Sequence, residues 1–80
     1  MVKIVTFFKL KPGNITSIVA NLKKIPEIVK IQTVTGEYDL LVEFEVSDPD
    51  EIYNIFSQKI DILPGLIDTN SHYVVALWEK

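Results

Sequence analysis

Apolar and polar residues alternate along residues 1–10, as expected of a β-strand with one buried side. One parity of this segment carries four apolar side chains and one threonine, namely Val2, Ile4, Thr6, Phe8 and Leu10. Period-two alternation of this kind is typical of a strand that covers a hydrophobic core. By the same pattern we expect further strands over residues 27–35, 38–46 and 66–79.

Two segments between these strands carry apolar residues at helical spacing. The first covers residues 15–25, follows Asn14 as its expected N-cap, and ends before Pro26. The second follows Asp48, which we expect to cap it, and ends at residues 63–65. Asparagine and aspartate are favoured at N-caps because their side chains accept hydrogen bonds from the first amides of a helix.

The expected order of elements is therefore strand–helix–strand–strand–helix–strand, within a single domain that covers residues 1–80. Two split strand–helix–strand halves interleave into an α+β, ferredoxin-like βαββαβ sandwich. We predict a four-stranded antiparallel sheet with both helices on one face. The first and third strands are then the central ones.

The face of the sheet that the helices leave open is also predicted to be apolar. We assign to it six residues of the first, third and fourth strands: Val5, Phe7, Leu41, Tyr73, Val75 and Leu77. An antiparallel sheet with one wet side would carry polar residues there. Scattered surface apolarity is a common alternative explanation. Because these residues align across strands, we interpret the face as a dimer interface, with sheet packed against sheet.

Asp39 is unusual because it lies within the apolar run of "VTGEYDLLVEF", residues 34–44. Aspartate is depleted in strands and favoured in turns, where it bonds nearby amides. Alternation places it away from Tyr38 and from the helix-covered core, near the rim of the open face. Two interpretations follow. Asp39 is a solvated turn acid, or it anchors an ammonium group of a ligand whose carboxylate meets the backbone amides at Gly36.

Charge and composition exclude several functions. The 11 acids outnumber the 8 bases, every base is lysine, and the net charge is −3. Direct nucleic-acid binding requires a basic face, so we expect none. The chain has no cysteine and a single histidine, His72, so no metal site or cofactor is expected. It has neither a membrane-spanning apolar run nor a signal peptide, and we therefore expect a cytoplasmic location.

The turn sequence and the later stretch "LPGLIDTNSHYVV", residues 63–75, resemble the effector domain of Lrp/AsnC transcription regulators. This domain is called RAM, for regulation of amino acid metabolism, and the resemblance covers nearly the whole chain. It implies sheet-paired dimers, higher oligomers of dimers, and a free amino acid effector bound between dimers without catalysis. The helix-turn-helix of the family is missing here, so the chain resembles a stand-alone RAM domain. Possible partners then include full-length regulators of the family.

The resemblance also implies a set of ligand-binding residues. By position these are Thr35, Gly36, Tyr38, Asp39, Thr69 and Ser71. Asp39 would meet the amino group of the effector. The stretch from Asp68 to His72 has a simpler interpretation as a solvated edge strand, which we favour for Asp68 and Asn70.

Two other functions remain open at this point. An ACT-type small-molecule sensor has a similar fold and role. A small dimeric ferredoxin-like monooxygenase would need a polar pocket and a histidine, which here is His72. No nucleophile motif surrounds this histidine. We therefore expect that the protein is not an enzyme.

Overall fold

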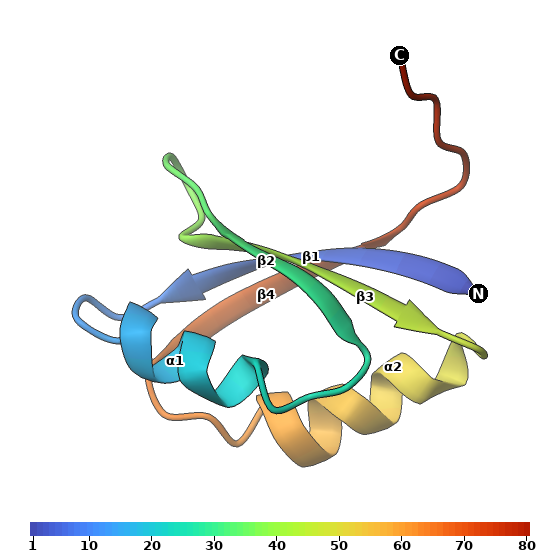
Figure 1. Cartoon of the computed structure of the whole chain (residues 1–80). Coiled ribbons are helices and arrows are strands. Elements are labelled where there is room, and N and C mark those ends of the chain that lie inside the picture. The colour runs from blue at the N-terminus through green and yellow to red at the C-terminus, as the bar shows by residue number, and fades with distance from the viewer.

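The fold was analysed in a computed structural model that describes all 80 residues. The strands form one antiparallel sheet in the order β2-β3-β1-β4, and the helices cover one of its faces (Figure 1). The elements are β1 (Val2–Leu10), α1 (Ile15–Leu22), β2 (Ile28–Thr33), β3 (Leu40–Val46), α2 (Asp50–Ile55), a π-helical continuation η1 (Phe56–Ile60) and β4 (Leu66–Tyr73). The predicted ferredoxin-like βαββαβ architecture is confirmed.

A single hydrophobic core lies between the sheet and the helices. Its buried side chains are Ile4, Phe8, Leu10, Ile18, Leu22, Ile25, Leu40, Val42, Phe44, Val46, Ile55 and Ile60. Every second residue of β3 is buried, which confirms the alternation expected from the sequence. Thr6 is the one buried polar residue, with 0% of its surface exposed. Its hydroxyl is hydrogen bonded to that of Ser71 on β4, with the oxygens 2.8 Å apart.

Both helices begin after the predicted residues, but only the second has a side-chain cap hydrogen bond. Asp48 accepts a hydrogen bond from the Asp50 amide at 2.9 Å, and Pro49 already has helical dihedral angles. Asn14 makes no cap hydrogen bond. Its amide nitrogen instead donates to the carbonyls of Lys11 and Pro12, because the side chain turns back into the loop before α1.

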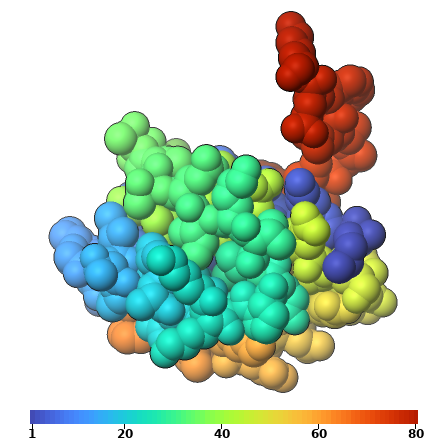
Figure 2. Space-filling model, viewed as in Figure 1, coloured from blue at the N-terminus to red at the C-terminus, as the bar shows by residue number.

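The fourth strand is shorter than predicted. It ends at Tyr73, which pairs with Ile4 of β1, and the Val74 amide donates to the Lys3 carbonyl at 2.9 Å. The predicted end at residue 79 is wrong because β1 begins at Val2, so later residues have no strand beside them. The residues after Val74 leave the body of the protein on the side opposite the helices (Figures 1 and 2).

This ending changes the expected composition of the open face. Val75 and Leu77 lie outside the sheet, with 96% and 64% of their surfaces exposed. Tyr73 pairs with the buried Ile4 and therefore lies on the helix-covered side, not on the open face as predicted. The prediction failed because parity was assigned from hydrophobicity, whereas strand register decides it. On the open side β4 presents polar residues, namely Asp68, Asn70 and His72.

The rest of the open face has an apolar half and a charged half. Half-buried Phe7 and Leu41 pair across β1 and β3, and Val5 follows on the same parity. Val5 lies opposite Glu43, which forms ion pairs with two lysines, Lys3 at 3.9 Å and Lys30 at 3.5 Å. Dimerisation through the apolar half remains a prediction.

Candidate functional site

The connection from β2 to β3 forms an exposed turn that projects beyond the sheet (Figure 1). The Val34 amide donates to the Asp39 carbonyl at 3.0 Å and closes the base of this turn. Gly36 has a φ of +106°, a conformation that residues with a Cβ rarely adopt. No atom lies within 4 Å of the position that a Cβ would occupy at Gly36. The turn therefore leaves free space beside its backbone, and Thr35 is exposed next to it.

Asp39 connects this turn to the end of β1. Its Oδ2 accepts a hydrogen bond from the Leu10 amide at 2.8 Å, and its own amide donates to the Phe8 carbonyl at 2.8 Å. One carboxylate oxygen of Asp39 therefore bonds a backbone amide, but that amide belongs to β1 and not to the turn. Asp39 forms no ion pair within the chain, and Oδ1 makes no hydrogen bond there. One oxygen of a half-buried carboxylate is left for another donor.

Lys9 brings a positive charge to the same turn, and sequence reasoning did not identify it. Its ammonium donates to the Glu37 carbonyl at 3.1 Å. Lys9 is exposed and lies between the buried residues Phe8 and Leu10 of β1. This alternation was the only feature of the sequence that could have indicated an outward-facing lysine near the turn. An anionic carboxylate and a cationic ammonium therefore both contact the short turn around Gly36.

Tyr38 does not lie where alternation placed it. Its ring packs against Phe7 on the open face, with ring centroids 5.4 Å apart, whereas we expected it on the side of buried Leu40. Alternation fails because the chain bends before Leu40, where β3 begins. The Asn70 side chain approaches the Tyr38 hydroxyl at 3.5 Å.

Thr69 and Ser71 lie on the helix-covered side of β4. Thr69 pairs with Phe8, the residue whose carbonyl receives the Asp39 amide, so Thr69 and Asp39 flank β1. Two strand spacings separate them, or roughly 10 Å. Ser71 lies further from the turn and is hydrogen bonded to Thr6. No hydrogen bond joins Thr69 to the turn, and Ser71 lies still further from it.

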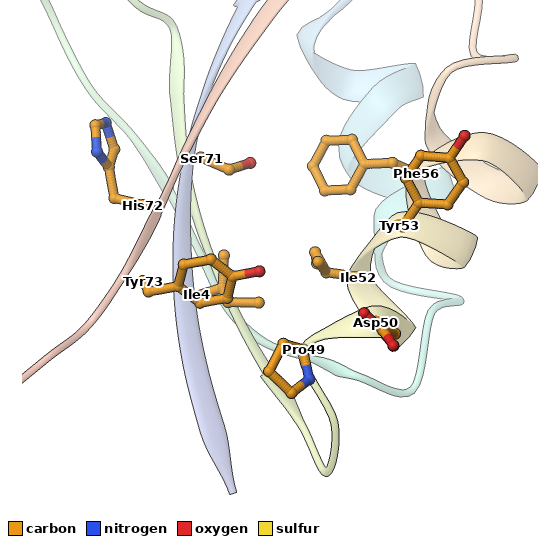
Figure 3. A pocket seen from close by; sticks show the side chains of 9 residues that line it. All are labelled: Ile4, Pro49, Asp50, Ile52, Tyr53, Phe56, Ser71, His72 and Tyr73. Atoms are coloured by element: carbon orange, nitrogen blue, oxygen red, sulfur yellow. The ribbon is translucent and has the colours of Figure 1, made fainter.

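Ser71 contributes instead to a groove between α2 and the end of β4 (Figure 3). The cavity has a volume of about 330 Å³ and is lined by Ile4, Pro49, Asp50, Ile52, Tyr53, Phe56, Ser71, His72 and Tyr73. Sequence reasoning missed this groove because residues of β1, α2, η1 and β4 form it together. In Figure 3 the imidazole of His72 points to the other side of β4 from Ser71. It approaches the Phe7 ring edge-on, with ring centroids 6.3 Å apart.

No three residues among His72, the aspartates and the glutamates are close enough together to hold a metal ion. None of the helices is long and apolar enough to cross a membrane.

Comparison with known proteins identifies relatives of the whole fold. The sequence model of the family described as the Lrp/AsnC ligand binding domain matches residues 3–77. The HTH-type transcriptional regulator FL11 of Pyrococcus horikoshii is 34% identical over 67 residues, which cover 84% of this chain. These residues make up 44% of FL11, so the chain spans less than half the length of that relative.

Two solved structures show the same fold at low sequence identity. The crystal structure of FFRP-DM1 has a TM-score of 0.87 at 24% identity, over 94% of this chain and 100% of that chain. A transcriptional regulator from Neisseria meningitidis, in complex with L-Met, has a TM-score of 0.89 at 17% identity. That match covers 99% of this chain and 53% of the regulator.

Proposed function

Because the chain belongs to the Lrp/AsnC ligand-binding domain family, we propose that it is a non-enzymatic sensor of a free amino acid. The proposed site is the turn formed by Thr35, Gly36, Tyr38 and Asp39, with Thr69 across β1. Ser71, which the family resemblance also implied, is left out of the proposed site because its hydroxyl is hydrogen bonded to that of Thr6. The effector binds where this turn meets another chain.

The observation that carries the proposal is the pair of opposite charges at Gly36. Oδ1 of Asp39 accepts no hydrogen bond within the chain, and the Lys9 ammonium donates one to the Glu37 carbonyl. A free α-amino acid carries an ammonium and a carboxylate on the same carbon atom. The ammonium would donate to Asp39, and the carboxylate would face Lys9 and the backbone beside Gly36. Hydrogen bonds between charged groups are stronger than those between neutral groups.

Exposure of the turn supports a site shared between chains. Thr35, Gly36 and Glu37 are all exposed, and one chain alone offers no wall opposite them. Small-molecule sites usually bury most of the ligand surface. A second chain would supply the missing wall, which is why we place the effector at a contact in an oligomer. The Neisseria relative in complex with L-Met is consistent with an amino acid as the ligand.

The proposed assembly begins with a dimer through the apolar half of the open face. Val5, Phe7 and Leu41 present half-buried apolar side chains there. Contacts between dimers would then complete the effector sites. A change in effector occupancy would alter this assembly, and transcription or metabolism would respond through partner proteins. Full-length regulators of the same family are candidate partners.

A thermal-shift screen of the common amino acids tests the proposal. A ligand at a hundredfold excess over its Kd adds about 2.7 kcal/mol to the free energy of unfolding. For so small a domain, each kcal/mol raises the Tm by roughly 4–8 °C. We expect a selective shift for one or a few amino acids, at each of several protein concentrations.

Two variants make this screen specific to the turn. Asp39→Asn keeps an acceptor for the Leu10 amide but removes the charge, so we expect it to lose the shift. Asp61→Asn removes one charge from an exposed carboxylate that makes no side-chain hydrogen bond, and should respond like the parent. No shift with any amino acid, or an equal shift in Asp39→Asn, would contradict the proposed site.

A further inference from the structure

The residues after β4 form an exposed apolar segment with no partner in the chain. This segment, residues 74–80, has the sequence VVALWEK. Val75, Leu77 and Trp78 have 96%, 64% and 86% of their surfaces exposed. Only the Val74 amide is hydrogen bonded to the body, through the Lys3 carbonyl. Burying large apolar side chains is favourable, so a segment of this composition is expected to have a partner surface.

The segment is not built to fold back onto its own chain. It contains no glycine, proline, asparagine or aspartate, the residues that form tight turns. The adjacent β-branched Val74 and Val75 favour an extended backbone. Figure 1 shows the segment rising on the side of the open face, away from the helices. The groove between α2 and β4 involves the helix-covered side, so the segment leads away from it.

We propose that residues 74–80 are an arm that packs against a second copy of this chain, with Trp78 as the buried anchor. The inference rests on the sheet-to-sheet dimer proposed above. In a twofold dimer each chain contributes one arm, and the two contacts are equivalent. The arm of one chain then lies against the sheet of the other, at the margin of the apolar half of the open face.

The length of the arm fits this arrangement. An extended chain rises about 3.3 Å per residue, so Trp78 reaches roughly 16 Å beyond Tyr73. Two sheets packed face to face lie about 10 Å apart. The arm therefore spans the distance between the sheets and brings Leu77 and Trp78 to the level of the second chain.

The size of the open face gives a reason for an arm. Stable interfaces bury about 800 Å² on each partner. Here the apolar half consists of half-buried Val5, Phe7 and Leu41, with the Tyr38 ring packed on Phe7, and ion-paired Glu43 follows Leu41 on the same side of β3. A tryptophan buries about 150–250 Å² by itself. Two arms would therefore supply a large part of the apolar area that the sheets lack.

Fluorescence of the intact chain tests the arm directly, because Trp78 is its only tryptophan. At high protein concentration we expect a blue-shifted emission that acrylamide quenches weakly. On dilution the emission should shift to the red in step with dissociation measured by analytical ultracentrifugation. Leu41→Asp should be monomeric and show exposed, readily quenched Trp78 at every concentration.

A second pair of variants measures the contribution of Trp78 to association. Trp78→Ala should raise the dimer Kd at least tenfold while the circular dichroism of the monomer is unchanged, because Trp78 is not part of the core. Tyr53→Ala is the matched control. Tyr53 is also an exposed aromatic, at 76%, but it lies on α2 at the helix-covered side, and its removal should leave the Kd unchanged.

Each contrary result has a distinct meaning. A dimer in which Trp78 stays exposed, or an unchanged Kd in Trp78→Ala, would overturn the arm and leave the sheet dimer intact. Blue-shifted emission that persists in the monomer would show that the segment packs on its own chain, which also overturns the arm. A chain that is monomeric at all concentrations would refute the proposed dimer itself.

Discussion

The carboxylate of Asp39 accepts a hydrogen bond from the backbone amide of Leu10 at 2.8 Å, across 29 positions of the sequence. The β1–β3 ladder ends at the pair Phe8 and Leu40, so β3 offers no carbonyl to Leu10. The side chain of Asp39 replaces that missing acceptor and holds the turn against the end of β1. One oxygen thus has a structural role, and the other is available for a ligand.

This division of roles makes different predictions for two substitutions of Asp39. Asp39→Asn retains an oxygen acceptor and should change the free energy of unfolding by less than about 1 kcal/mol. Asp39→Ala leaves the half-buried Leu10 amide unpaired, which costs about 1–3 kcal/mol. Urea denaturation at a fixed protein concentration measures both. Equal stability of the two variants would show that the hydrogen bond contributes nothing.

The buried hydroxyl of Thr6 provides a second test of the packing. Ser71→Ala removes its partner and leaves the Thr6 hydroxyl unsatisfied, so we expect a loss of about 1–3 kcal/mol. Adding Thr6→Val removes the unsatisfied group and should restore most of that loss. A double-mutant cycle by urea denaturation measures the coupling between the two positions. Simple additivity of the two single effects would contradict the contact.

Gly36 and Gly65, two of the three glycines with positive φ, should differ in their tolerance of alanine. At Gly36 the cost is that of the backbone conformation alone, about 1–2 kcal/mol, because the space beside it is empty. At Gly65, with φ +91°, a Cβ would also lie 2.5 Å from the Asn14 side chain. Gly65→Ala should therefore be the more destabilising in thermal denaturation. Asn14→Ala combined with it should recover part of the loss, and no recovery would argue against the clash.

Charge placed in the apolar half of the open face should dissociate the proposed dimer. Leu41→Asp and Phe7→Asp each bury a carboxylate between the sheets if the dimer forms, which is strongly unfavourable. We expect monomers in sedimentation velocity, with circular dichroism to confirm the fold. Ile62→Asp introduces the same charge at a residue that is 70% exposed in the loop after η1, and should remain dimeric. A dimeric Leu41→Asp variant of unchanged stability would refute sheet pairing.

The sequence predicted the fold well because β1 and β3 alternate cleanly and both helices have apolar stripes. Predictions from the sequence failed where the register between distant strands decides which side of the sheet a residue faces and where a strand ends. Tyr73 lies on the helix-covered side because it pairs with Ile4, and β4 ends there because β1 begins at Val2. Tyr38 departs from alternation because the chain bends before β3.

Part of the geometry around the candidate site could be expected from the sequence. The unusual position of Asp39 in an apolar run pointed to the turn, and the positive φ of Gly36 agrees with its role there. The hydrogen bond to Leu10 and the ammonium of Lys9 were not predictable, because they join segments 28 and 29 positions apart. Such contacts depend on how the strands are aligned.

The most direct test of the central claim is an amide NMR titration with the amino acid that gives the largest thermal shift. We predict that the largest chemical-shift changes fall on residues 35–39, on Lys9 and Leu10, and on Thr69. Further changes are expected on whichever residues of the adjoining chain complete the site. Changes confined to the groove between α2 and β4, or none at saturating ligand, would contradict an amino-acid site at Asp39.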